Sequence, residues 1–317
     1  MRRVGLALAA VVVLVIAASG AYLGWDRLDP ERLDVPVGGF TIEAAGVSTH
    51  VEHWPAARPS GLPPLVLVPG FAESTYVWSR AAPLLAADRD VYAYDVRGYG
   101  YTARVGPYTL DADTDQLAGV LSTLHLSRPV VVGHSLGVAI ALSLALRDPA
   151  SVTGVVAANG DGTPYFGDDR SGTGSRGPRV LLVPPVAPAV ITAGVRNRGP
   201  IRSLVSGQCG PGCPVDDASV DRWRAPFLLP GAVNALVEIA REPLIGLTDP
   251  QELQVRVPVG IVFSDGDGSF DRDSATATAS RLHTTAVAEL SGERHLALLG
   301  APDRFADAVR RVMPRSM

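Results

Sequence analysis

The sequence contains no lysine, only two cysteines and few aromatic residues, which make up 6% of the chain. All 28 basic residues are therefore arginines, and they are scattered along the chain without a dense cluster. Proteins that bind nucleic acid usually carry such a cluster, so we expect no nucleic-acid partner. The 317 residues, of which 47% are hydrophobic and 19% charged, are typical of one large globular domain or of a domain with an insertion.

The two cysteines, Cys209 and Cys213, lie close together in the segment SGQCGPGCPV. The Gly-Pro-Gly between them can turn the chain enough to bring the sulfurs together, so we expect a small structural disulfide, with free thiols as the alternative. A metal site is less favoured, because no histidine or further cysteine lies near enough to complete four ligands. The sequence indicates no metal and no organic cofactor.

Charge is absent from residues 4–25, an uncharged run of 22 residues that follows Arg2 and Arg3. This run is long enough to cross a bilayer, which needs about 20 apolar residues, and Tyr22 and Trp25 are typical interfacial residues. A cleaved signal peptide is the competing interpretation, because small residues follow the most apolar part, and a buried core helix is a third. The arginine pair places the N-terminus in the cytoplasm. We therefore expect residues 1–25 to attach the domain to the outside of the cell membrane or, alternatively, to be removed on secretion.

The pattern after a charged, proline-containing linker at residues 26–37 alternates between strands and helices. Two short alternating stretches around Gly46 predict a hairpin at 40–54. Apolar runs predict further strands at 64–70, 91–95, 130–132, 152–159, 257–263 and 286–290. Helical patterns lie at 76–87, 111–124, 136–146, 273–282 and 302–313. This alternation indicates βαβ units, and thus an α/β fold with a mostly parallel sheet flanked by helices.

The alternation breaks at residues 161–254, which are rich in glycine and proline. Short helical patterns occur there near 182–193, 217–225 and 231–241. We interpret this segment as a helical cap inserted between the two parts of the core, residues 38–160 and 255–317. A cap in this position lies over the carboxyl ends of the strands, where open α/β folds bind ligands. Its apolar stretch at 181–194 would suit a hydrophobic acyl or alcohol group, or would pack onto the core.

Ser135 stands in the pattern G-x-S-x-G, within the segment VVVGHSLGVAIAL at residues 130–142. A strand, this pattern and a helix in succession place the serine on a sharp turn, with its hydroxyl exposed at the end of the strand. A chain with 33 glycines can contain the pattern by chance, but its one occurrence falls at the strand-to-helix junction that the chemistry requires. We therefore predict that Ser135 is a nucleophile.

His295 is the predicted base, because a serine hydroxyl is a weak nucleophile until a base takes its proton. It follows the last predicted strand, on a loop at the same edge of the sheet as Ser135. The other histidines belong to the hairpin, a helix end, the serine turn and the run before the last strand, where surface or packing roles are common. These are His50, His53, His125, His134 and His283.

Asp267 is the predicted acid that fixes the tautomer of His295 and stabilises its protonated form. It lies in the segment VFSDGDGSFD, beyond the strand predicted at 257–263. Asp265 is closer to that strand and has less reach. Asp161, Asp265 and Asp271 remain as alternatives, and each aspartate here could equally be a turn residue.

The backbone amides of Phe71 and Leu136 are the predicted oxyanion donors. Phe71 follows the strand and glycine turn of LVLVPGFAES, and Leu136 follows the nucleophile at the start of a helix. Both amides belong to the same edge of the sheet, as an acyl-transfer site requires.

The order Ser135, Asp267, His295 and the insertion between strands resemble the α/β-hydrolase fold family, specifically its cap-bearing esterase-like members. The resemblance covers residues 38–313 and is carried by GHSLG, PGF, DVRGYGYT, SDGDG and GERH. It implies that the cap sets specificity. The chain departs from the family where Pro69 replaces the usual histidine before a glycine, and where Val138 replaces a second glycine.

We therefore expect an exported or membrane-attached serine hydrolase that cleaves a small, hydrophobic carboxylic ester through an acyl-enzyme. Membrane contact would involve residues 4–25 if this segment is not cleaved. Hydrolysis of a carbon-carbon bond, amide cleavage or perhydrolysis on the same three residues is the enzymatic alternative. A binding protein that uses the pocket without catalysis is the remaining one.

Overall fold

Short valine-rich runs of the sequence form the strands of one sheet. The computed structural model describes residues 2–28, 31, 33–34, 37–163, 184–241 and 246–313. Within these residues, the sheet has eight strands in the order β1-β2-β4-β3-β5-β6-β7-β8. Their bounds are β1 Phe40–Ala44, β2 Val47–Trp54, β3 Leu65–Val68, β4 Val91–Tyr94, β5 Val130–His134, β6 Gly154–Ala158, β7 Val259–Ser264 and β8 Val287–Leu290.

The pairing of the strands confirms a mostly parallel sheet. The hairpin of β1 and β2 is antiparallel, and β2 pairs with β4 in the same sense, whereas every other neighbouring pair is parallel. The central strands β3, β5, β6 and β7 are buried along their whole length. Burial on both faces explains why these strands read as continuous apolar runs.

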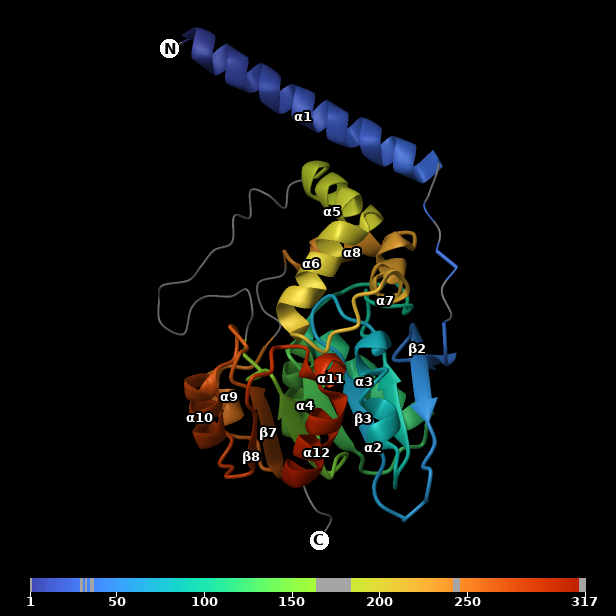
Figure 1. The fold of residues 1–317 in the computed structure, drawn as a ribbon, viewed down its shortest axis with the longest axis vertical. Coiled ribbons are helices and arrows are strands. Elements are labelled where there is room, and N and C mark those ends of the chain that lie inside the picture. The colour runs from blue at the N-terminus through green and yellow to red at the C-terminus, as the bar shows by residue number, and fades with distance from the viewer. Residues whose placement is uncertain are drawn as a thin grey trace.

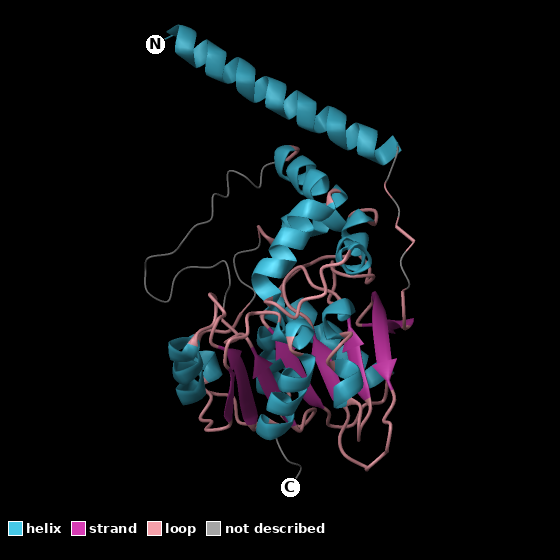
Figure 2. Ribbon diagram, in the orientation of Figure 1, coloured by secondary structure: helices cyan, strands magenta, loops and turns pink. Residues whose placement is uncertain are grey.

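Helices cover both faces of the sheet (Figure 2). Val66 and Val68 of β3 belong to the apolar cluster that includes α3, α4 and α10, while Leu65 and Leu67 belong to the cluster of α2, α11 and α12. This division follows from the alternation of side chains along a strand. The core helices are α2 Ala82–Leu85, α3 Leu110–Thr123, α4 Leu136–Arg147, α10 Arg272–Arg281, α11 Ala297–Gly300 and α12 Pro302–Val312.

Two helix predictions were wrong in detail. The single helix expected at 76–87 is instead a 3-10 helix, η1 (Thr75–Trp78), and the separate short helix α2. Pro83 lies in the first turn of α2, where its missing N–H and fixed φ favour the start of a new helix over the continuation of an old one. The helix α6 (Arg198–Cys209) was not predicted, because glycine and proline occupy its first turn.

The chain between β6 and β7 forms a helical layer above the carboxyl ends of the parallel strands (Figure 1). Its described helices are α5 Val186–Arg196, α6, α7 Asp217–Arg224, η3 Ala225–Leu228, α8 Ala232–Ile239 and α9 Asp249–Glu252. These include the helices predicted near 182–193, 217–225 and 231–241, although residues 164–183 and 242–245 lie outside the described part.

The N-terminal residues Arg2–Leu28 form the helix α1, which Figure 1 shows beyond the cap helix α5. Among the residues that the structure describes, no helix combines the length and the apolar character needed to span a bilayer.

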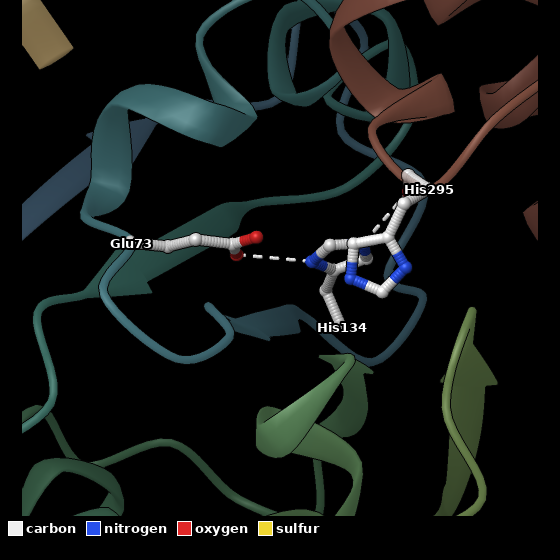
Figure 3. A group of neighbouring side chains, drawn as sticks. All are labelled: Glu73, His134 and His295. Carbon is white, nitrogen blue, oxygen red and sulfur yellow. Dashed lines mark hydrogen bonds and ion pairs between the residues drawn. The ribbon is translucent and has the colours of Figure 1, made fainter. Parts of the chain in front are cut away.

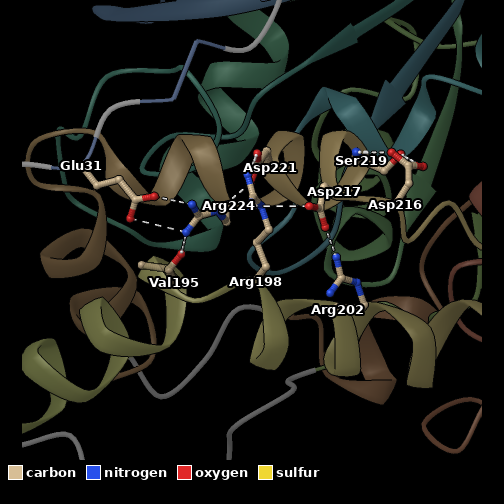
Figure 4. A network of polar contacts seen from close by, with 9 residues as sticks. All are labelled: Glu31, Val195, Arg198, Arg202, Asp216, Asp217, Ser219, Asp221 and Arg224. Atoms are coloured by element: carbon tan, nitrogen blue, oxygen red, sulfur yellow. Dashed lines mark hydrogen bonds and ion pairs between the residues drawn. The ribbon is translucent and has the colours of Figure 1, made fainter.

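A network of charged side chains joins the segment after α1 to the cap (Figure 4). Arg224 of α7 is only 3% exposed. Its guanidinium donates to Asp221 at 2.9 Å and to the carbonyl of Val195 at 2.8 Å. It also forms an ion pair with Glu31. Arg198 donates to both carboxylate oxygens of Asp221, at 2.8 and 2.6 Å, and these bonds lower the pKa of Asp221 to about 2.

Replacing Arg224 should weaken the cap. We expect Arg224→Ala to lower the free energy of unfolding, measured by urea denaturation, by about 3 kcal/mol, because buried acceptors lose their donor. Arg202→Ala is the control: the side chains of Arg202 and its partner Asp217 are 38% and 65% exposed, and exposed pairs contribute about 1 kcal/mol or less. Equal losses in the two variants would contradict this assignment.

Candidate active site

Ser135 occupies a strained turn between β5 and α4. Its φ of 51° and ψ of −120° lie outside the regions that L-residues ordinarily adopt. A Cβ on Gly133 would lie 2.4 Å from the carbonyl oxygen of Gly137, and a Cβ on Gly137 would lie 2.3 Å from that of Val68. Both glycines of the G-x-S-x-G pattern are therefore required by backbone packing, and the turn holds the serine at the carboxyl end of β5.

Val138, the departure from the family pattern, lies in the core near Gly162. Its side chain is fully buried in α4. A Cβ on Gly162 would lie 3.6 Å from Val138 Cγ1 and only 2.8 Å from Leu142 Cδ1, and Gly162 has a φ of 82°. The distance to Val138 is an ordinary contact, so Gly162 is required by Leu142 and by its own backbone conformation rather than by the valine.

His295 and Asp267 meet at the carboxyl ends of β8 and β7. The Nδ1 atom of His295 lies 2.6 Å from Oδ2 of Asp267, and the two side chains are 9% and 1% exposed. An acid that accepts from Nδ1 leaves Nε2 of the same ring to serve as the base.

Asp267 is held as a carboxylate by several donors. Burial by itself would raise its pKa, but the hydrogen bond and charge of His295 lower that pKa to about 2, with help from Asn159 and Ser269. Asn159 Nδ2 donates to Oδ2 at 2.9 Å, while the amide and hydroxyl of Ser269 donate to Oδ1 at 2.9 and 2.8 Å. The acid is therefore ionised and fixed in orientation at neutral pH.

The other aspartates weighed for this role bind backbone or hydroxyl groups of nearby loops. Asp161 accepts from the amide and hydroxyl of Thr163, at 3.0 and 2.6 Å. Asp265 accepts from the amide of Gly292 at 2.6 Å, and Asp271 caps the first turn of α10. The hydrogen bond from Nδ1 of His295 to Asp267 thus favours Asp267 as the acid.

The remaining histidines differ in their surroundings. His53 stacks on Tyr92, with ring centroids 4.2 Å apart, and lies 3.2 Å from the carboxylate of Asp90. His125 and His283 occupy turns with φ near 52°. His134 is different, because it lies fully buried directly before the nucleophile and its ring centroid is 4.8 Å from that of His295.

The loop after β3 runs against the nucleophile. A Cβ on Gly70 would lie 2.9 Å from the Cβ of Ser135, so only glycine lets this loop come so close. The next residue is Phe71, whose ring packs edge-on against Tyr99 at 5.9 Å. Leu136 begins α4, and the first amides of a helix have no carbonyl partner within it. The predicted oxyanion donors thus belong to the two segments that adjoin Ser135, the loop after β3 and the start of α4.

A pocket of about 310 Å³ opens beside Ser135. It is lined by Leu136, Ala139, Asn159, Gly160, Asp161, Gly162, Thr163, Ser269 and Phe270. A larger cavity of about 780 Å³ lies between α1, α5 and α8, and no candidate catalytic residue lines it. Because Ser135 lines it, the smaller pocket is the candidate substrate site.

The disulfide loop of the cap contacts the loop that carries His295. Cys209 and Cys213 are bonded, with Cα atoms 5.3 Å apart. Just before Cys209, the carbonyl of Gln208 accepts from the amide of Leu296 at 2.9 Å. Arg80 of the core donates to the carbonyl of Gly212, also at 2.9 Å. The cap is thereby attached to the residue that follows the candidate base.

Comparisons with known proteins support the same fold. A family model described as alpha/beta hydrolase fold matches residues 63–174. The chain is 33% identical, over 135 residues, to 2-hydroxymuconate semialdehyde hydrolase of Pseudomonas sp. (strain CF600), a match that covers 41% of this chain and 46% of that enzyme. The chain thus spans less than half the length of such curated relatives.

Two solved structures share the fold at 19% sequence identity. The meta-cleavage product hydrolase from Pseudomonas fluorescens IP01 has a TM-score of 0.67, covering 86% of this chain and 97% of that chain. A bacterial membrane phospholipase A has a TM-score of 0.68, covering 99% of this chain and 98% of that chain.

Sequence reasoning missed Asn159, Glu73 and His134 as parts of this site. Asn159 stands at the end of β6 with a φ of 48°, a conformation that asparagine tolerates better than most residues. An asparagine directly after a buried parallel strand was the available signal. Glu73 and His134 gave none, because their contacts depend on loops brought together by the fold.

The hydrogen bond from His295 to Asp267 leads to a prediction about the reactivity of Ser135. We expect Asp267→Asn to slow covalent labelling of Ser135 by a fluorophosphonate by roughly 10³-fold, because the amide no longer fixes the required tautomer. Labelling rates followed by intact-protein mass spectrometry measure this effect. Asp265→Asn is the matched control and should react at close to the unaltered rate. The assignment fails if Asp267→Asn reacts normally and Asp161→Asn does not.

Proposed function

The chain belongs to the α/β-hydrolase fold family, and from this premise we propose that it is a hydrolase that cleaves carboxylic esters through an acyl-enzyme. One observation carries the proposal. Ser135 stands on a strained turn at the same edge of the sheet where His295 and an ionised Asp267 are joined by a 2.6 Å hydrogen bond.

In the first half of the proposed reaction, Nε2 of His295 takes the proton of Ser135 as Oγ attacks the ester carbonyl. The carbonyl oxygen becomes an oxyanion, which the amides of Phe71 and Leu136 stabilise. The tetrahedral intermediate then collapses, the bond to the alcohol oxygen breaks, and the protonated His295 gives its proton to the departing alcohol. Asp267 stabilises the positive charge of His295 between these two transfers.

In the second half, His295 takes a proton from water, whose oxygen attacks the acyl carbonyl on Ser135. The same two amides hold the second oxyanion. When this intermediate collapses, the bond to Oγ breaks, the acid leaves, and His295 returns its proton to Ser135. Each step needs only groups that the chain supplies, together with water.

The pocket beside Ser135 supports a small, uncharged acyl group as substrate. Leu136, Ala139 and Phe270 provide apolar walls, while Asp161 brings a carboxylate to the same pocket. Among its described lining residues there is no arginine to bind an anionic substrate. An acyl group that itself carries a carboxylate is therefore disfavoured by charge.

Hydrolysis of a carbon-carbon bond is the second candidate, and the comparisons favour it specifically. They include a 2-hydroxymuconate semialdehyde hydrolase and a meta-cleavage product hydrolase. A muconate derivative carries a carboxylate, however, and the lining of the pocket offers it no described cationic partner. The ester is therefore the better match to this chain.

A panel of p-nitrophenyl esters, varied in acyl length, tests the proposal. We expect turnover of short acyl esters, no turnover of a 2-hydroxy-6-oxo-dienoate, and loss of both turnover and fluorophosphonate labelling in Ser135→Ala. Asp271→Asn, which alters only a helix cap, is the control and should retain activity. Faster cleavage of the dienoate than of any ester would establish the second candidate instead, and a folded protein that no fluorophosphonate labels would end the serine mechanism.

We also propose that the domain works outside the cytoplasm after export through residues 1–25. An arginine pair followed by 22 uncharged residues supports this location, as does the bonded pair Cys209 and Cys213, because disulfides persist in oxidising compartments. Fractionation of cells that express the full chain should find the protein outside the cytoplasm. Cys209 and Cys213 should then not react with a thiol reagent unless the disulfide is first reduced. Recovery from the cytoplasm with both thiols free would contradict export.

A further inference from the structure

A second acid-histidine pair lies beside His295 (Figure 3). His134 is fully buried and Glu73 is 6% exposed. Nδ1 of His134 lies 2.9 Å from Oε2 of Glu73, and Nε2 lies 3.0 Å from the backbone carbonyl oxygen of His295. The mechanism derived above uses neither side chain.

The partners of His134 determine how many protons its ring carries. A backbone carbonyl can only accept a hydrogen bond, so Nε2 must carry a proton. An ionised Glu73 also only accepts, and it then requires a proton on Nδ1 as well. Burial alone would raise the pKa of Glu73 and lower that of His134, but the attraction between the two reverses both directions. The pair is therefore a carboxylate and an imidazolium.

This pair connects the loops that carry the reacting groups. Oε2 of Glu73 accepts from the amide of Gly70 at 2.6 Å, directly before the predicted oxyanion donor Phe71. His134 is the residue before Ser135, and its ring donates to the main chain of His295. The oxyanion loop, the nucleophile turn and the histidine loop thus meet at a single ion pair.

The same atoms do not form a metal site. Ligand-type atoms of Glu73, His134 and His295 lie within 4.8 Å of one another. Both ring nitrogens of His134 are committed to acceptors, however, and Oε2 of Glu73 already binds an amide and the ring. A metal ion would have to displace these hydrogen bonds and the proton on each nitrogen.

We propose that Glu73 and His134 are positioning residues for the reaction proposed above, on which this inference rests. They hold the main chain of His295 so that its ring reaches Ser135 and Asp267 together, and they hold Gly70 so that the Phe71 amide points at the oxyanion. A buried ion pair is costly to desolvate, and an apolar replacement is often as stable. Its place between three catalytic loops therefore indicates alignment rather than stability as its role.

Glu73→Gln tests the role of the charge, since glutamine keeps the shape of the side chain. We expect a loss of roughly 10- to 100-fold in both kcat and the rate of fluorophosphonate labelling, with KM within about twofold, because the base and oxyanion donor are misplaced while the pocket is not. Glu252→Gln is the matched control, because Glu252 is a fully buried carboxylate that pairs with Arg281 of α10. It should retain both rates.

Labelling separates this inference from the function on which it rests. An unaltered protein that is not labelled would overturn the proposed function, whereas a folded Glu73→Gln protein labelled at the unaltered rate would overturn only the positioning role. A measurement on the unaltered protein covers the case in which the variant does not fold. In ¹⁵N spectra of the histidine rings, His134 should retain two N–H groups at pH 8, and a single N–H there would refute the ion pair.

Discussion

The close approach of backbone segments around Ser135 is the constraint on which the rest of the structure depends. A Cβ on Gly160, after β6, would lie 2.7 Å from the carbonyl oxygen of Ser135, and Gly70 approaches the serine from the side of β3. Such distances are possible only where side chains are missing. The loops of three adjacent strands therefore converge on the nucleophile, and the strain at its φ and ψ is held by packing on all sides.

Convergence of this kind buries polar groups, and the charged side chains described at the site are paired. Asp267 receives hydrogen bonds from His295, Asn159 and Ser269, and Glu73 and His134 neutralise each other one layer below. Because an unpaired polar group is costly in a low-dielectric interior, these pairings leave few alternative arrangements of the loops. The pairing of charged side chains at the site thus follows from how tightly its backbone is packed.

The sequence predicted those parts of the fold and site that follow from local pattern. Buried parallel strands appear as apolar runs, and the chain order places Ser135, Asp267 and His295 after successive strands, so position alone led to residues that the structure gathers at one edge. Contacts between distant loops could not be foreseen. Glu73 and His134 are 61 positions apart, and His134 and His295 are 161 apart, so neither contact leaves a periodic signal. The separation of η1 from α2 depends on Pro83. The hydrophobic pattern continues across this proline, so it predicted one helix where the structure has two.

The cap contributes to the alignment of the catalytic loops as well as covering them. Leu296, next to the candidate base, donates to Gln208 of the cap, while Arg80 of the core binds both Gly212 of the disulfide loop and Leu299 of α11. The histidine loop is therefore held by His134 and by the segment that precedes and includes the disulfide. Because Leu296 and Arg294 of this loop donate to the carbonyls of Gln208 and Gly207, a change in residues 207–213 would alter the support of His295.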